Sequence, residues 1–177
     1  MARQTWVALL RAVNLGARNR VPMPRLRELL AEHGCEDVRT YIASGNAVFT
    51  SGTSKAKLAR ELERAIEKEF GVSTPVLLRT EKELAALVDR HPFDDLAHTH
   101  VAFLAKKPTA AKVKALAGID VAPDRVEVLG QEAYWHLPNG VQGSRLSGAQ
   151  LEKHLGVAAT VRNWRTVARL AEMATDG

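Results

Sequence analysis

A single stretch, residues 37–50, restricts the possible folds more than any other part of the chain. Two runs with high β propensity lie on either side of Ser44-Gly45-Asn46. A glycine next to an asparagine supplies the positive φ angles that a tight hairpin turn needs. The stretch therefore predicts a strand, a turn and a second strand.

The residues around this hairpin predict an α+β arrangement. An apolar run at 4–12 favours a strand, and apolar residues at helical spacing over 23–33 favour a helix. A second helix is expected over 54–70. An edge strand is expected over 74–79, because the proline in it cannot donate to a ladder. The order predicts a ferredoxin-like split βαββαβ subdomain over residues 1–80, with the strand order four, one, three, two.

Residues 81–177 predict a second, smaller α+β subdomain with the order βαββα. A strand near 100–105, a helix ending at Gly118 and a hairpin over 125–137 precede two C-terminal helices. Helix starts are marked by two pairs with the spacing of a capping box, Thr80 with Glu83 and Ser147 with Gln150.

Composition narrows the cellular setting. Of 177 residues, 46% are hydrophobic and 25% are charged, which is typical of a globular domain with a real core. No apolar run approaches the roughly 20 residues of a membrane helix. The N-terminus begins a strand-like run without the regions of a signal peptide, and the single cysteine, Cys35, has no internal disulfide partner. These features predict a cytoplasmic protein with no membrane association.

The positive charge is concentrated near the N-terminus. The formal net charge is +5, and the first 30 residues, with six arginines and one glutamate, account for all of it. A second basic segment runs from Arg145 to Arg169. Basic clusters on one face attract phosphates, whereas scattered surface arginines are simply solvated, and both interpretations stay open.

Topology predicts where the polar loop residues meet. In the split βαββαβ arrangement the first two strands run in the same direction, so the connections that follow them lie at the same sheet edge. The residues expected at or near this edge are Asn14, Gly16, Arg18, Asn19, Arg20, Tyr41, Ser44, Gly45 and Asn46. Two guanidinium groups, amides and a hydroxyl there suit a phosphate or carboxylate. The alternative is that Asn, Ser and Gly are ordinary turn residues.

Catalytic and cofactor motifs are not found. The loop 14–20 has too few glycines for a dinucleotide fingerprint, and neither a Walker loop nor a Gly-x-Ser-x-Gly elbow occurs. The histidines at 91, 98, 100 and 136 lack diagnostic metal-site spacing. The strand after the hairpin turn carries Phe49 alone where RNA-binding sheets carry several aromatics. The sequence thus specifies no catalytic residue, metal or cofactor, and leaves open whether the protein is an enzyme.

Several segments together resemble a known family. They are 9–16, Met23, 26–30, 39–49, 151–157 and 159–167. This pattern is similar to the domain-of-unknown-function family 1697. The resemblance implies a small bacterial cytoplasmic protein with an α+β fold of two subdomains, and it brings no activity, cofactor or catalytic residues. Family members often have glycine where this chain has Ala12 and Ala17.

The resemblance also adds two C-terminal candidates, Arg162 and Asn163, which match polar positions of the family. We expect the tail to fold back so that Arg162 joins Arg18 and Arg20. The alternative assigns Asn163 to capping the last helix and Trp164 to the core.

Three functional hypotheses follow. The first is a non-enzymatic binding module for an anionic ligand, namely a nucleotide, a phosphorylated metabolite or nucleic acid. The second is an enzyme of unknown reaction that uses the same edge. The third is a protein-interaction or dimerisation domain, and both a monomer and a homodimer are compatible with the sequence.

Overall fold

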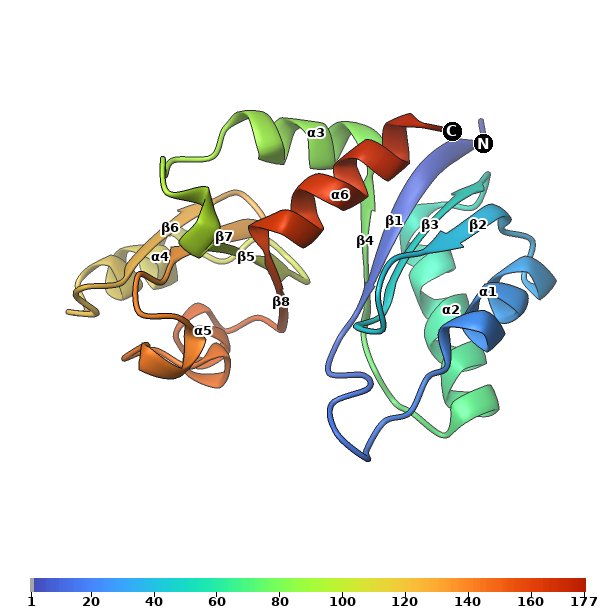
Figure 1. Ribbon diagram of the computed structural model, residues 1–177, viewed down its shortest axis with the longest axis horizontal. Coiled ribbons are helices and arrows are strands. Elements are labelled where there is room, and N and C mark those ends of the chain that lie inside the picture. The colour runs from blue at the N-terminus through green and yellow to red at the C-terminus, as the bar shows by residue number, and fades with distance from the viewer. Residues whose placement is uncertain (1) are drawn as a thin grey trace. The chain divides into compact units, whose positions relative to one another are not determined.

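Residues 2–177 form a mixed α+β structure with two four-stranded antiparallel sheets, as the computed structural model shows (Figure 1). The chain divides into two units. The first consists of the residues up to Ala86 together with Arg169–Gly177, and the second of Leu87–Ala168. The α+β class expected from the sequence is confirmed, and the division at residue 80 stays a prediction.

The first sheet is built from the N-terminal residues. Its elements and the helix that follows them are β1 (Gln4–Leu10), α1 (Met23–Glu32), β2 (Glu36–Thr40), β3 (Asn46–Ser51), α2 (Lys55–Phe70), β4 (Val76–Thr80) and α3 (Glu81–Asp89). The strand order is β2-β3-β1-β4, with every neighbouring pair antiparallel. The strand that follows Pro75 therefore lies at an edge, where a missing backbone donor is tolerated.

The second sheet has the same arrangement of strands. Its elements are η1 (Leu96–His98), β5 (Thr99–Leu104), α4 (Ala110–Ala117), β6 (Arg125–Leu129), β7 (Glu132–His136), η2 (Val141–Gly143), α5 (Gly148–Leu155), β8 (Ala159–Asn163) and α6 (Trp164–Thr175). The order β6-β7-β5-β8 repeats that of the first sheet. Strand β8 was not among the elements predicted from the sequence, because its buried residues include Thr160 and Arg162, which do not produce an apolar strand pattern.

Helix starts follow the local signals in the sequence. Glu83 N donates to Thr80 Oγ1 (3.1 Å) and Thr80 N donates to Glu83 Oε2 (2.8 Å), so the expected capping box is formed. Ser147 and Gln150 form the second one at the start of α5. Both boxes satisfy backbone donors that the first turn of a helix leaves without intrahelical partners.

Each sheet buries one face against its own two helices. In the first unit Trp6, Phe49 and Leu78 from the sheet pack with Leu26 and Leu62 from α1 and α2. The second unit repeats this with a core of Leu104, Trp135, Leu116, Leu151 and Leu155. No helix formed by residues 2–177 is both long enough and apolar enough to cross a membrane.

Cys35 lies in the first core with 3% of its surface exposed. Burial, reinforced by Glu61, raises the pKa of its thiol to about 11. We therefore expect a disulfide reagent to modify native protein at pH 8 about a hundredfold more slowly than protein unfolded in guanidinium, since only the thiolate reacts. Equal rates in the two states would contradict this placement, and the absence of a second cysteine makes the signal specific.

Candidate functional site

Two connections of the first unit lie side by side at one edge of its sheet. Because β1 and β2 are both antiparallel to β3, they run in the same direction and end at the same edge (Figure 1). Leu10 N donates to Gly45 O (2.8 Å), and Asn14 Nδ2 donates to Ala43 O (2.7 Å). Residues 11–21 and 41–46 are called the loop edge below. Their proximity is what the topological argument predicted.

Asn14 holds the loop edge together. Its Nδ2 donates to Val21 O (2.8 Å) as well as to Ala43 O, and its Oδ1 accepts from Val21 N (2.8 Å). Its backbone N donates to Asn19 O (2.9 Å). Since both amide hydrogens are donated within the protein, Asn14 positions the loop and has no further donor to offer a ligand.

Two other amides act in the same way. Asn46 is fully buried, and its Nδ2 donates to Tyr41 O (3.1 Å) and Ser44 Oγ (2.8 Å). Asn19 Nδ2 donates to Ala12 O (3.1 Å). These contacts fix the two connections in one conformation. Tyr41 and Ser44 are both half-buried beside them.

The backbone of the loop edge is unusually rich in left-handed residues. They are Ala12 (φ 53°), Asn14 (55°), Gly16 (64°), Asn19 (52°), Ile42 (48°) and Gly45 (83°). Glycine and asparagine accept this region, whereas an alanine or a β-branched residue is strained there by about 1–2 kcal/mol. Strain of this kind persists only where surrounding contacts impose it.

The exposed side chains of the loop edge are basic or apolar. Arg18 and Arg20 are exposed, and neither forms a hydrogen bond or ion pair with residues 2–177. Leu15 and Ile42 are large apolar side chains that are 68% and 53% exposed. No aspartate or glutamate occurs in residues 11–21 or 41–46. The loop edge therefore presents unbalanced positive charge next to exposed apolar surface.

The start of α1 contributes less than a helix N-terminus usually does. The N-cap is Pro22, and a second proline, Pro24, follows in the first turn. Proline has no backbone N–H, so only Met23 and Arg25 keep free donors there, since Leu26 N bonds to Pro22 O. Any anion at the loop edge would depend on guanidinium groups more than on the helix.

The C-terminal candidates belong to the second unit. Arg162 on β8 is 8% exposed, its Nη1 donates to Thr160 Oγ1 (2.7 Å) and Val161 O (3.1 Å), and burial lowers its pKa to about 10. Asn163 Oδ1 accepts from Thr166 N (2.9 Å) at the start of α6, which is the capping role considered as the alternative. The expected meeting of Arg162 with Arg18 and Arg20 involves different units and stays a prediction.

A second polar cluster joins Asp95 to His98 and His136, two of the histidines that the sequence grouped only as a metal site without diagnostic spacing. Asp95 Oδ2 lies 2.9 Å from His98 Nδ1 and 3.0 Å from His136 Nε2. The hydrogen bond with His136, and to a smaller extent the one with His98, lowers the pKa of Asp95. His136 comes from β7, 41 residues away in the chain, so spacing gave no signal. Within residues 2–177 no set of three or more His, Cys, Asp and Glu side chains is arranged to hold a metal ion.

These observations define a class of protein: a chain of two α+β units, with a basic loop edge on the first. The chain belongs to the DUF1697 family, described as a protein of unknown function, whose family model matches residues 3–134. The resemblance noted from the sequence is thereby confirmed.

A solved structure extends the similarity to the whole chain. The conserved bacterial protein SP0830 from Streptococcus pneumoniae is 26% identical to it, with a TM-score of 0.76 over 98% of this chain and 99% of that one. No curated protein matches the sequence. The comparisons thus give a family and a fold without a specific function.

Two glycines of the loop edge allow a matched test of its geometry. Both have positive φ, but a Cβ at Gly16 meets nothing within 4 Å, whereas one at Gly45 would lie 2.7 Å from Val13 Cγ2 and 2.8 Å from Leu10 Cβ. We expect Gly16→Ala to lower the free energy of unfolding by about 1 kcal/mol, because the alanine is strained at a positive φ. Gly45→Ala should lower it by about 3 kcal/mol, because overpacking against Val13 and Leu10 is added to the same strain. Urea denaturation measures both, and equal losses would refute the close contact at Gly45.

The Asp95 cluster predicts a pH dependence of stability. A carboxyl group whose pKa is lower in the folded state binds more protons when unfolded, so stability rises with pH through its usual pKa of about 3.9 and is lost as pH falls below it. We expect Asp95→Asn to reduce this rise between pH 3 and 5, as measured by chemical denaturation. Asp94→Asn, at an exposed neighbour, is the control. An unchanged pH profile in Asp95→Asn would contradict the interpretation.

Proposed function

We propose that this protein is a binding module for an anionic ligand, a nucleotide, a phosphorylated metabolite or nucleic acid, which binds at the loop edge. The observation that carries the proposal is the pair Arg18 and Arg20, exposed and unpaired within residues 2–177, on a loop without acidic residues. Exposed guanidinium groups that are not neutralised by the protein favour phosphate or carboxylate partners.

In this proposal the amides and the arginines have different tasks. Asn14, Asn19 and Asn46 fix the backbone, and Arg18 and Arg20 supply the charge. Because the connections are already held in a strained conformation, little backbone entropy remains to be lost on binding. The exposed Gly16 and the half-buried Ser44 belong to the same surface, whereas Gly45 is buried and shapes the turn beneath it.

The apolar side chains favour one kind of anion within this class. Leu15 and Ile42 are exposed at the same edge as the arginines. A ligand with a planar, weakly hydrated part next to a phosphate would cover both kinds of surface. Nucleotides and single-stranded nucleic acid have this composition, whereas inorganic phosphate does not.

The loop edge favours binding over catalysis. Residues 11–21 and 41–46 contain no histidine, cysteine, lysine or carboxylate side chain. A general acid or base with a pKa near neutrality would have to come from another part of the chain or from the ligand. A binding role needs no such group.

The proposal also includes the fold type of the first unit and the cellular location of the protein. We assign the first unit to the ferredoxin-like folds, supported by its element order and its β2-β3-β1-β4 sheet. A cytoplasmic location is supported by the single buried cysteine, which forms no disulfide.

The test uses fluorescence anisotropy with labelled single-stranded RNA and DNA oligonucleotides and a labelled adenine nucleotide. For an oligonucleotide held by both arginines we expect the logarithm of the binding constant to fall with the logarithm of salt concentration with a slope of about −1.4, about −0.7 for each phosphate contacted. The variant Arg18→Ala/Arg20→Ala should lose this salt dependence and most of the affinity.

The control is Arg60→Ala/Arg64→Ala, which removes the same charge from exposed positions of α2. It should bind like the wild type if the loop edge is the site. Equal losses in the two double variants would indicate a nonspecific charge effect. Absence of binding by wild-type protein at low salt would remove the proposal.

A further inference from the structure

The edge strands of the two sheets are β2, β4, β6 and β8, and they differ in how well they are protected against pairing with a strand of another chain. In β2 the register shifts between Glu36 and Arg39, with Asp37 at a positive φ, which is the pattern of a β-bulge. At β4 the side chain of Glu63 accepts from Val76 N (3.0 Å), and at β8 a glutamate accepts from Ala159 N (2.8 Å). Bulges and occupied donors are the usual devices that prevent pairing with another chain.

Strand β6 has neither a bulge nor a side chain on its outward N–H groups; its only side-chain contact of this kind within residues 2–177 is Arg90 Nη2, which donates to Leu129 O (3.2 Å) next to the turn. Its five residues pair with β7 in an uninterrupted register, and it contains no proline. Leu129 and Glu132 flank a two-residue turn and therefore form a hydrogen-bonded pair. Because hydrogen-bonded and non-hydrogen-bonded pairs alternate along an antiparallel ladder, the backbone groups of Arg125 and Glu127 also point toward β7. The N–H and C=O groups of Val126 and Val128 then point to the open side, where no strand of residues 2–177 pairs.

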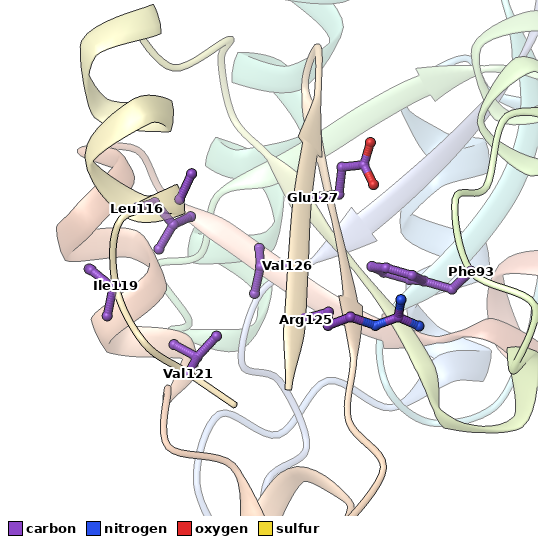
Figure 2. Close-up of a pocket in the computed structure, with 8 residues that line it drawn as sticks. Phe93, Leu116, Ile119, Val121, Arg125, Val126 and Glu127 are labelled. Carbon is purple, nitrogen blue, oxygen red and sulfur yellow. The ribbon is translucent and has the colours of Figure 1, made fainter. Parts of the chain in front are cut away.

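A groove of about 440 Å³ follows this open strand (Figure 2). On one side of β6 it is lined by the apolar side chains of Leu116, Ile119 and Val121, and on the other side by Phe93 with Arg125 and Glu127. The guanidinium carbon of Arg125 lies 4.8 Å from the centre of the Phe93 ring, which orients this exposed cation. Apolar surface beside unpaired backbone groups is suited to an added strand.

We propose that the open edge of β6 pairs antiparallel with β6 of a second copy of this chain, around a two-fold axis at Val126. This register brings Arg125 opposite the partner's Glu127, and Glu127 opposite the partner's Arg125. These are non-hydrogen-bonded pairs, in which facing side chains approach most closely. A two-fold interface must be complementary to itself, and the alternation of charges along β6 satisfies this condition.

Charge also favours this register over the one in which the two-fold axis is shifted by one residue. An axis at Glu127 would place two carboxylates directly opposite each other, which is destabilising. In the proposed register the backbone groups of Val126 bond to those of the partner's Val126. The two joined edges are short, so the dimer is weak and depends on protein concentration.

The test is sedimentation velocity of the full chain from 5 to 500 µM. We expect the wild type to show a monomer–dimer equilibrium, and Arg125→Glu and Glu127→Arg each to weaken it at least about tenfold, because two attractive pairs become repulsive. An equimolar mixture of these two variants should dimerise again, since each chain then presents the charge that the other lacks. The variant Arg125→Glu/Glu127→Arg should also dimerise.

Further variants separate pairing from loss of the fold. Val126→Pro removes an outward N–H without touching the bonds to β7 and should abolish the dimer, while thermal melting followed by circular dichroism shows whether each variant is folded. Arg64→Glu, an exposed reversal on α2, should dimerise like the wild type. So should Arg18→Ala/Arg20→Ala, which keeps this test independent of the loop edge.

Three outcomes would overturn the proposal. They are a wild-type monomer at 500 µM, a dimer that persists in folded Arg125→Glu and Glu127→Arg, and single variants whose mixture stays monomeric. The second outcome would place the contact elsewhere, and the third would exclude the two-fold pairing of Arg125 with Glu127. Pairing of β6 with a peptide from another protein would appear as the first outcome.

Discussion

The side-chain amide of Asn14 is the constraint on which the loop edge depends. One residue closes the 14–21 loop through both backbone groups of Val21 and ties that loop to the hairpin turn through Ala43 O. An aspartate would lose both donated hydrogen bonds, and a serine is too short to span the two connections. The amide is satisfied only while Asn14 holds its left-handed φ, so backbone conformation and side-chain bonding enforce each other.

This constraint separates structural residues from residues free to bind. The polar residues that the sequence suggests as ligand donors include three amides that are used internally, whereas the two arginines remain directed to solvent. Amides that are hydrogen-bonded to the backbone can preorganise a surface, because they fix the loop conformation before any ligand binds. The loop edge thus carries its charge on Arg18 and Arg20, while uncharged residues fix the backbone of the loops.

Local signals in the sequence predicted much of the first unit. The proline before β4 and the capping box at Thr80 each act over a few residues, and each is formed as expected. The connection between β2 and β3 differs from the expected tight turn at Ser44–Asn46: it spans residues 41–45, has its positive φ angles at Ile42 and Gly45, and leaves Asn46 in β3. The adjacency of the two connections followed from strand directions alone. Strand β8 was missed because Arg162 is a charged residue in a buried position, which a hydrophobic pattern cannot signal. The hydrogen bonds of Asp95 to His98 and His136 were not predicted, because His136 reaches that carboxylate from a distant hairpin.

The two units share a strand order but differ in the lengths of the connections at one edge of the sheet. In the first unit, residues 11–22 connect β1 to α1, and residues 41–45 connect β2 to β3. The equivalent connections of the second unit are residues 105–109 and 130–131. Both longer connections lie at the same edge of the same sheet, and this edge carries the strained backbone and the two arginines that have no partner within residues 2–177. A rigid scaffold gains function through its loops, because the core tolerates few changes. Extra chain that is strained and held by side-chain amides is costly to stability, and the proposed ligand-binding role gives this edge a use that offsets the cost.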